Sequence, residues 1–235
     1  MPLSVSIIIP TWQEALAIAP CLEHLARQAG PFDVWVVDGQ SPDDTAALAR
    51  RTAAGLPFPC QVVTAPQQGR AAQMNFGAGL AAGDVLLFLH ADTRLPDDGL
   101  ADLRGALDDP AVIGGHFAVR LDDPGLLYVA LGAMINWRSR LSGLFTGDMG
   151  MFVRRSAFAE LNGFPPLALM EDLAMAKRLR RLGPLTTLAT PVTTAARRWQ
   201  QRGLGRTILL MQVLRAGYAV GVSPDRLAGW YRAIR

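Results

Sequence analysis

Acidic side chains follow two of the apolar, strand-like runs in the first half of the chain. Asp38 comes directly after Val34–Val37, and both His90 and Asp92 follow Val85–Leu89. Ligands of open α/β sheets bind beyond the carboxyl ends of the strands, so these positions are the first candidates for a site. A carboxylate there can accept hydrogen bonds from a base or a ribose, which makes Asp38 a candidate nucleoside contact. One strand-end acid serves the fold as often as it serves function, but two favour a ligand site.

His90 and Asp92 are also candidates for a metal site. Alternate residues of an extended segment point the same way, so these two side chains could share one divalent cation or one ribose–metal assembly. An imidazole beside a carboxylate suits Mn²⁺ better than Mg²⁺. The sequence leaves two other interpretations of His90 open, a contact with ribose and simple packing.

A third acidic position opens the helical pattern Glu171–Leu182. Acidic residues in a first helical turn are favoured by the helix dipole, and a carboxylate can equally serve as a general base. Asp148, between two glycines, could orient an acceptor or belong to a tight turn. Trp12 and Trp199 could stack on a base or sugar ring, or could pack as wedges between helix and sheet. The pattern alone leaves each pair of interpretations open.

Two common phosphate-binding motifs are missing. The segment after the first strand-like run, Pro10–Glu14, has no GxGxxG, and no GxxxxGK[ST] occurs anywhere. An ordinary dinucleotide-binding domain and a P-loop NTPase are therefore disfavoured.

The spacing of the elements predicts how these residues come together. Short β-rich runs alternate with helical patterns up to residue 110, which indicates right-handed crossovers and a parallel sheet covered on both faces. Ser41, Pro42 and Asp44 predict the start of the second helix, with Ser41 as its N-cap. The predicted strands of this half are Val5–Ile9, Val34–Val37, Val62–Thr64 and Val85–Leu89, with three helices between them.

The alternation ends after residue 110. We expect a single domain over residues 1–235, with a nucleotide-binding half at 1–110, an acceptor half at 111–203 and C-terminal helices at 204–235. The patterns predict strands at Ile113–Val119 and Gly150–Arg154 and helices at Leu126–Leu141, Glu171–Leu182, Gly205–Tyr218 and Pro224–Ile234.

Composition limits the class of protein. The chain has 235 residues, of which 50% are hydrophobic and 18% charged, enough for one substantial core. No apolar stretch is long enough to span a membrane, and the N-terminus lacks the pattern of a signal peptide. Cys21 and Cys60 have no CxxC spacing, which fits a reduced compartment. We therefore expect a cytoplasmic protein, and we interpret His24 and His116 as structural.

Charge is distributed unevenly although the net charge is only +3. Residues 173–224 contain Lys and Arg but no Asp or Glu. Such a segment could face a pyrophosphate, an anionic membrane surface or solvent, whereas nucleic acid is disfavoured because no stacking pattern accompanies the charge. The apolar pattern at 205–218 favours packing on the core over membrane binding. Peripheral contact with the inner face of the cell membrane, and a lipid-linked acceptor, are the milder expectation.

Taken together, the ordered motifs resemble the family 2 glycosyltransferases over nearly the whole chain, in particular a small bacterial branch with LHADT and RRW. The resemblance implies a GT-A fold, a Rossmann-like three-layer α/β sandwich with a mixed, mostly parallel sheet. The motifs are PTWQE, VVDGQSPDDT, GRAAQMNFGAG, GDVLLFLHADT, GDMGMFVRR, NGFP, MED and RRW.

The resemblance also implies roles for single residues. Asp92 would bind Mn²⁺ or Mg²⁺, with His90 as a second ligand, and Asp172 would be the general base of an inverting transfer, with Glu171 as its less favoured substitute. The donor would be a nucleotide-diphosphate sugar, UDP-linked by preference. Asp148 and Trp199 would face the acceptor. The nucleotide site would include Pro10, Thr11, Glu14, Asp38, Arg70, Asn75, His90, Ala91, Arg197 and Arg198.

The sequence departs from the family pattern in two places. His90 stands where the family usually has the first acid of a DxD pair, which leaves Asp92 as the one hard ligand and predicts weak metal affinity. Arg197-Arg198-Trp199 only partly matches the QxxRW signature of processive members, which argues against polymer synthesis.

The sequence leaves two alternatives to a glycosyltransferase open. A nucleotidyltransferase acting on a sugar phosphate would use a metal at similar strand ends, but it would need an early glycine-rich loop followed by a basic residue, and Gly69-Arg70 comes too late. A non-catalytic nucleotide-sugar-binding protein would explain the missing first acid, and the intact Asp172 argues against it.

Overall fold

The computed structural model describes residues 2–233, without the side chains of residues 198, 201, 202, 232 and 233. In the first half, each predicted strand is present, three with wider bounds and the fourth one residue shorter, and three helices lie between the strands as predicted. The elements are β1 (Val5–Thr11), α1 (Ile18–Leu25), β2 (Phe32–Asp38), α2 (Thr45–Ala53), β3 (Cys60–Thr64), α3 (Arg70–Leu80) and β4 (Val85–Phe88).

The second half contains both the predicted elements and several additional ones. The elements here are β5 (Thr93–Arg94), α4 (Gly99–Ala106), β6 (Gly114–Leu121), α5 (Leu126–Ser142), the 3-10 turn η1 (Gly147–Met149), β7 (Met151–Arg154), α6 (Arg155–Glu160), α7 (Glu171–Leu182), β8 (Leu185–Thr194), α8 (Arg197–Arg202), α9 (Leu204–Ala219) and α10 (Pro224–Ala233).

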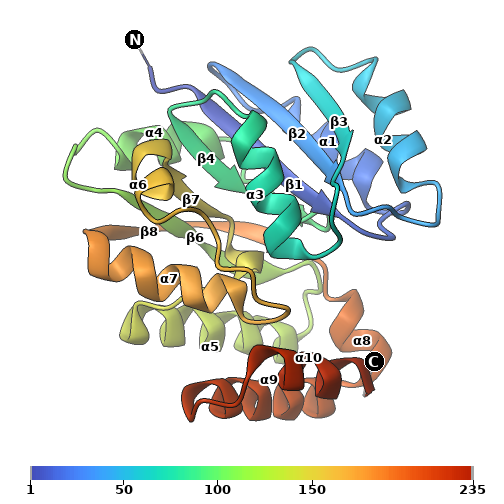
Figure 1. Cartoon of the computed structure of the whole chain (residues 1–235), viewed down its shortest axis with the longest axis vertical. Coiled ribbons are helices and arrows are strands. Elements are labelled where there is room, and N and C mark those ends of the chain that lie inside the picture. The colour runs from blue at the N-terminus through green and yellow to red at the C-terminus, as the bar shows by residue number, and fades with distance from the viewer. Residues whose placement is uncertain (1, 234–235) are drawn as a thin grey trace.

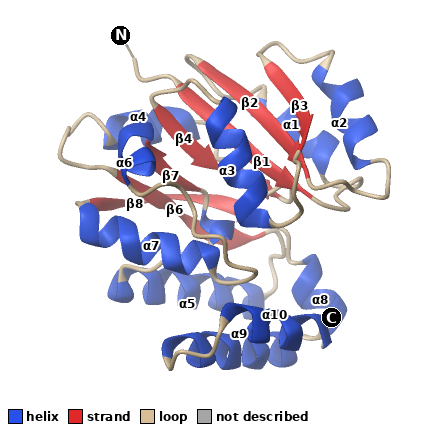
Figure 2. Cartoon of the chain, in the orientation of Figure 1, coloured by secondary structure: helices blue, strands red, loops and turns tan. Residues whose placement is uncertain are grey.

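The strands form one 8-stranded sheet in the order β3-β2-β1-β4-β7-β6-β8-β5 (Figure 2). β1 pairs in parallel with β2 on one side and with β4 on the other. β7 is antiparallel to both of its neighbours, β4 and β6. The chain therefore runs outward from β1 to β3 and then returns to the opposite side of β1, which creates a topological switch point between the carboxyl ends of β1 and β4.

Helices cover both faces of this sheet. In Figure 1, α3 lies in front of β1 and β4, whereas α1 lies behind the sheet. The strands between these layers are continuously apolar because both of their faces are buried, and Ile7, Ile8 and Ile9 have no exposed surface. Burial of this sheet fixes the strand ends that carry the candidate residues.

One local prediction is wrong. Ser41 is not the N-cap of α2, which begins at Thr45. The Ser41 hydroxyl instead donates to Asp38 Oδ1 at 2.6 Å, and Asp43 Oδ1 accepts from the backbone N–H of Thr45. The carboxylate at the end of β2 thus competes successfully for the hydroxyl that would have capped the helix.

β8 is the largest element that the sequence did not predict. Its segment is rich in threonine and contains Pro191, which cannot donate a ladder hydrogen bond. The structure accommodates this proline at a shift of register, where Phe117 pairs with Leu188 but Ala118 pairs with Pro191. A bulge at this point explains why the segment lacks a regular strand pattern.

The C-terminal helices α9 and α10 pack on the rest of the chain beneath α5 and α7 (Figure 1). Leu214 of α9 and Leu227 of α10 are buried together with Met170 and Leu173, which flank the start of α7. The packing interpretation of α9 is therefore confirmed. Within residues 2–233, no helix is long and apolar enough to cross a membrane.

Candidate active site

The exits of β1 and β2 meet at a buried carboxylate. Asp38 is 2% exposed, and its Oδ1 accepts from the hydroxyls of Thr11 at 3.3 Å and Ser41 at 2.6 Å. Asp38 Oδ2 accepts from the backbone N–H of Ser41 at 2.9 Å. The carboxylate thus holds the two loops together, and any contact with a nucleoside would use its remaining lone pairs.

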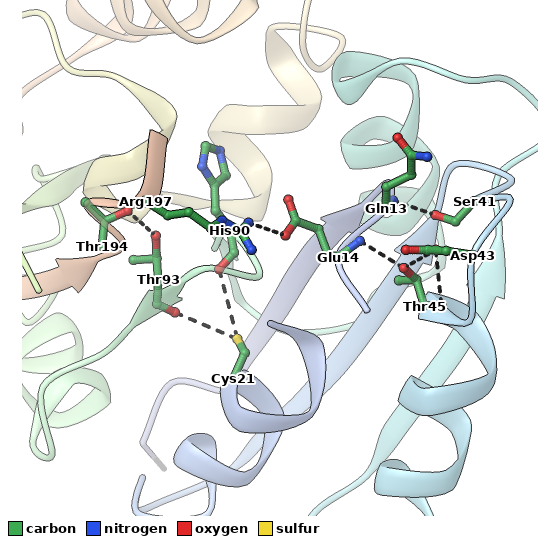
Figure 3. Close-up of polar contacts among 10 residues, drawn as sticks. All are labelled: Gln13, Glu14, Cys21, Ser41, Asp43, Thr45, His90, Thr93, Thr194 and Arg197. Carbon is green, nitrogen blue, oxygen red and sulfur yellow. Dashed lines mark hydrogen bonds and ion pairs between the residues drawn. The ribbon is translucent and has the colours of Figure 1, made fainter. Parts of the chain in front are cut away.

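The loops that follow these strands contain backbone conformations that side chains rarely adopt. Gln13 has φ of 56° and Gln40 has φ of 63°, both in the left-handed region. The turn after β1 is tied to the turn after β2, because Ser41 Oγ accepts from Gln13 N–H and Thr45 Oγ1 accepts from Glu14 N–H (Figure 3). Unfavourable conformations that are held by neighbouring bonds are typical of binding sites.

Gln73, which sequence reasoning missed, joins the same two strand ends from α3. Its side chain is 4% exposed, and Nε2 donates to the carbonyl oxygens of Thr11 and Val37, each at 2.8 Å. A Cβ on Gly39 would lie 2.9 Å from this amide, so only glycine fits beside it. A single glutamine inside an amphipathic helix gives no signal of such a role.

The exit of β4 carries His90 and Asp92 on the other side of the switch point. The hydroxyl of Thr93 donates to Thr194 Oγ1 at 3.0 Å (Figure 3). The backbone carbonyl of Asp92 accepts from the N–H of Ala195, so this loop is joined to the end of β8. His90 Nε2 lies 2.8 Å from the position that a Cβ on Gly147 would occupy. Glycine at 147 therefore allows the 3-10 turn to approach the imidazole.

The start of α7 brings the third acidic position to the same place. Gly147 N–H donates to Asp172 Oδ2 at 2.9 Å. Glu171 is 3% exposed, and its carboxylate lies 3.4 Å from the guanidinium of Arg70. Burial raises the pKa of Glu171, and the positive charge of Arg70 opposes this shift. Met170, just before this turn, has φ of 67°, a third side chain in the left-handed region.

These groups line one cavity of about 170 Å³, called the central cavity below. Its lining residues come from elements that are far apart in the sequence, namely α3, the exit of β4, the 3-10 turn, α8 and the start of α7. The predicted site residues that line it are Arg70, His90, Asp92, Asp148, Glu171, Asp172 and Trp199.

The donor set fits a divalent cation that is completed by its substrate. No group of three or more His, Cys, Asp or Glu side chains could hold a metal among the residues that the structure describes. Mg²⁺ and similar ions are commonly bound through one or two carboxylates together with substrate phosphates. Asp92, with His90 beside it, matches such an incomplete set.

Other predicted residues lie outside this cavity. Asn75 is not among the residues that line this cavity, and its amide donates to the carbonyl of Phe164 and accepts from the N–H of the same residue. Arg197 pairs with Glu14 at 3.3 Å at the rim (Figure 3). The side chain of Arg198 lies outside the described residues.

Two further predicted residues form the walls around the switch point. Pro10 lies in β1 opposite Val37, and Ala91 is 4% exposed between His90 and Asp92.

The histidines interpreted as structural are bound within the fold: His24 bonds to the carbonyl of Leu95, and His116 lies near the hydroxyls of Ser139 and Thr187.

A mixed sheet with a switch point, and acidic side chains gathered at it, agree with the GT-A fold that the motifs imply. The family model described as glycosyl transferase family 2 matches residues 6–161. The chain belongs to this family, which confirms the resemblance of its motifs.

Curated relatives support the same family. A PGL/p-HBAD biosynthesis glycosyltransferase of Mycobacterium bovis is 36% identical over 151 residues, which cover 63% of this chain and 54% of that protein. The glycosyltransferase AglE of Haloferax volcanii is 27% identical over 199 residues, covering 80% of this chain and 65% of that protein. The chain thus spans less than two thirds of the length of both relatives.

Solved structures share the fold. The mannosyltransferase PcManGT of Pyrobaculum calidifontis, in complex with GDP-Man and Mn²⁺, has a TM-score of 0.69 at 22% identity and covers 100% of this chain and 70% of that one. The TarS protein of S. aureus, in complex with UDP, has a TM-score of 0.68 at 19% identity and covers 82% of this chain and 60% of that one.

Proposed function

We propose that this chain transfers a sugar from a nucleoside-diphosphate sugar, UDP-linked by preference, to an acceptor hydroxyl with inversion at the anomeric carbon. The observation that carries the proposal is the convergence of Asp92, His90 and Asp172 in one cavity at the switch point of the sheet. Similar folds were solved with GDP-Man and with UDP, which supports a nucleotide-linked donor and leaves the base to experiment.

The nucleoside would lie over the exits of β1 and β2. Thr11, Glu14 and Asp38 are the proposed contacts there, and the bonds between these loops support a pre-formed site. A site that needs no reordering loses less free energy when the ligand binds. The diphosphate would then lie toward β4, where Arg70 and the rim residue Arg197 carry positive charge.

The proposed metal residues are Asp92 and His90. A bound Mn²⁺, or Mg²⁺, would supply positive charge that stabilises the departing diphosphate. Asp92 provides the hard oxygen ligand and His90 the nitrogen that favours manganese. Because the chain supplies only this small set, affinity for the metal alone should be weak and should rise when nucleotide is bound.

Asp172 is the proposed base. Its Oδ2 accepts from the N–H of Gly147, which orients the carboxylate within the cavity. Asp172 takes the proton of the acceptor hydroxyl while the oxygen forms a bond to the anomeric carbon. The bond from that carbon to the phosphate oxygen breaks, and its electron pair leaves with the diphosphate.

Glu171 is better suited to hold Arg70 than to act as the base. Its carboxylate is buried, and it pairs with the Arg70 guanidinium at 3.4 Å. A carboxylate engaged in this way would have to give up its partner before it could take a proton. Glu171 thereby holds the Arg70 charge next to Asp172, where it can stabilise the negative charge of the departing diphosphate.

Calorimetric titration of UDP, GDP and UTP, with and without Mn²⁺, tests the proposal. Manganese-dependent binding of UDP that is lost in Asp92→Ala, together with UDP release from a UDP-sugar, is the expected result. A preference for UTP with release of diphosphate would indicate nucleotidyl transfer. Binding of UDP-sugar with no release of UDP would indicate a non-catalytic binding protein.

A further inference from the structure

Beside Asp172, the central cavity has an apolar region between three helices. Its walls here come from Leu131 and Ile135 of α5, Leu173 of α7, and Ile208, Met211 and Leu214 of α9. A pocket for a sugar hydroxylated on every face would need many polar partners, which these side chains do not provide. The lining therefore suits an apolar body that lies directly beside the proposed base.

Two arginines near this apolar region form no ion pair among the described residues: Arg215 of α9 lines the cavity, and Arg138 lies about one helical turn after Met134 and Ile135 on α5. Arg138 of α5 is largely buried, and its Nε and Nη2 atoms find no hydrogen-bond partner within the described part of the chain. Burial, and then the charge of Arg215, lower the pKa of Arg138 to about 10, and the carboxylates of Asp148 and Asp172 only partly oppose this shift. Two guanidinium groups that repel each other in a desolvated place would be stabilised by an anion.

The cavity also meets an apolar surface. Met134 lines the cavity and is 41% exposed, so the apolar region opens along α5. Further exposed apolar side chains follow on this helix, with Leu127 at 69%, Trp137 at 65% and Leu141 at 68%. An apolar ligand longer than the cavity could therefore extend over α5 without entering water.

From these features we propose that the central cavity is the acceptor site and that the acceptor is an anionic amphiphile. Its apolar body packs between α5 and α9, its phosphate or carboxylate lies near Arg138 and Arg215, and its hydroxyl faces Asp172. This inference rests on the proposed function, because the hydroxyl oxygen forms the same bond to the anomeric carbon described above.

Binding of three probes to the whole chain tests the chemistry. Dodecyl phosphate, dodecan-1-ol and inorganic phosphate are titrated by calorimetry below their aggregation limits. We expect dodecyl phosphate to bind at least about tenfold more tightly than either of the others, a difference of about 1.4 kcal/mol. In Arg215→Met, dodecyl phosphate and dodecan-1-ol should bind about equally. Equal binding of these two probes in the wild type would overturn the anionic part of the proposal.

A matched pair of variants on α5 tests the place of binding. Met134 and Leu127 are separated by two helical turns on the same side of α5, but only Met134 lines the cavity. Met134→Glu should weaken dodecyl phosphate binding more than tenfold, whereas Leu127→Glu should weaken it much less. An equal loss in both variants would indicate adsorption to the exposed face of α5 and would overturn the cavity assignment.

Nucleotide binding separates this inference from the proposed function. UDP and GDP are titrated into the same variants, and each variant should retain the nucleotide affinity of the wild type, which also shows that it is folded. Nucleotide binding without binding of dodecyl phosphate would overturn the acceptor inference alone. Dodecyl phosphate binding without nucleotide binding would overturn the proposed function. Two further probes identify the source of the anion. Binding to vesicles of phosphatidylglycerol would indicate a lipid acceptor, whereas binding of the soluble aryl carboxylate 6-hydroxy-2-naphthoate would indicate a soluble acceptor.

Discussion

The exits of β1 and β2 differ from the central cavity in how their polar groups are satisfied. At the strand exits, the carboxylate of Asp38 and the amide of Gln73 bond to protein donors and acceptors. At the cavity, burial raises the pKa of the lining residue Glu171, and the nearby Arg138 of α5 has nitrogen atoms without a partner among the described residues. One region is complete before any ligand arrives, while the other holds charges that a ligand would stabilise.

This difference indicates how the two regions can change independently. The strand exits are fixed by backbone groups of a buried sheet, so their geometry depends on few side chains. The cavity is enclosed by α5, α7, α9 and α10, whose side chains can be replaced without altering the strands. A nucleotide site of constant shape can thereby be combined with acceptor sites of different chemistry.

The largest expected effect comes from removing the proposed base. Asp172→Asn keeps the size of the side chain and an acceptor oxygen for Gly147 N–H, but it cannot take a proton. Turnover should fall by about 10²- to 10⁴-fold, with nucleotide affinity unchanged. UDP release measures turnover, and Asp148→Asn in the same cavity is the control with a smaller loss. Turnover near the wild-type rate in Asp172→Asn would assign the base elsewhere.

The second largest effect is expected at the exits of β1 and β2. Gln73→Leu removes the amide donor from the buried carbonyl oxygens of Thr11 and Val37, while the N–H of Gly39 still donates to Thr11, so the free energy of unfolding should fall by about 0.5–1.5 kcal/mol per lost hydrogen bond. Nucleotide affinity should fall as well, because both strand exits lose a support. Urea unfolding and UDP titration measure the two effects.

A matched glutamine provides the control for this change. Gln200 donates to Asp123 at 2.8 Å on the surface, where water can replace the bond. Gln200→Leu should therefore change stability by less than about 0.5 kcal/mol. If both variants lose the same stability, the strand exits do not depend on the amide of Gln73.

The sequence predicted the first region better than the second. The runs at Val5–Ile9 and Val34–Val37 are continuously apolar because β1 and β2 are largely buried on both faces, so the strand ends could be located and Asp38 placed at the exit of β2. Gln73 was missed because nothing in a helical pattern marks a side chain that reaches back to two strand ends. The N-cap assigned to Ser41 was wrong because a tertiary partner took its hydroxyl.

The second region could not be predicted because it forms between elements distant in the sequence. β8 lacks strand alternation where Pro191 forces a register shift, and the apolar wall joins α5 to α9. The cavity depends on how those helices pack, which periodicity does not specify. Family resemblance supplied Asp172 and its role, whereas the pattern alone could not separate a base from a charged first helical turn.

A smaller effect should appear in the pH dependence of stability. Because the folded state raises the pKa of Glu171, this group contributes stability below the unfolded value near 4.5 and loses it as pH rises through the folded value. Glu171→Gln should therefore gain stability relative to the wild type as the pH rises above about 4.5. Urea unfolding at several pH values measures this gain, and the exposed Glu160→Gln should show none. A constant difference in stability between Glu171→Gln and the wild type across this pH range would mean that burial does not raise the pKa of Glu171.

The smallest effect is expected where the two regions meet. Glu14, at the exit of β1, and Arg197, at the start of α8, pair at 3.3 Å with side chains 26% and 44% exposed. Arg197→Met should lower the free energy of unfolding by no more than about 1 kcal/mol, because exposed ion pairs are weak and screened by salt. UDP titration of the same variant adds a sharper test. A loss of nucleotide affinity larger than the loss of stability would mean that Arg197 leaves Glu14 to contact the diphosphate, whereas equal affinity would confine it to joining α8 to the strand exits.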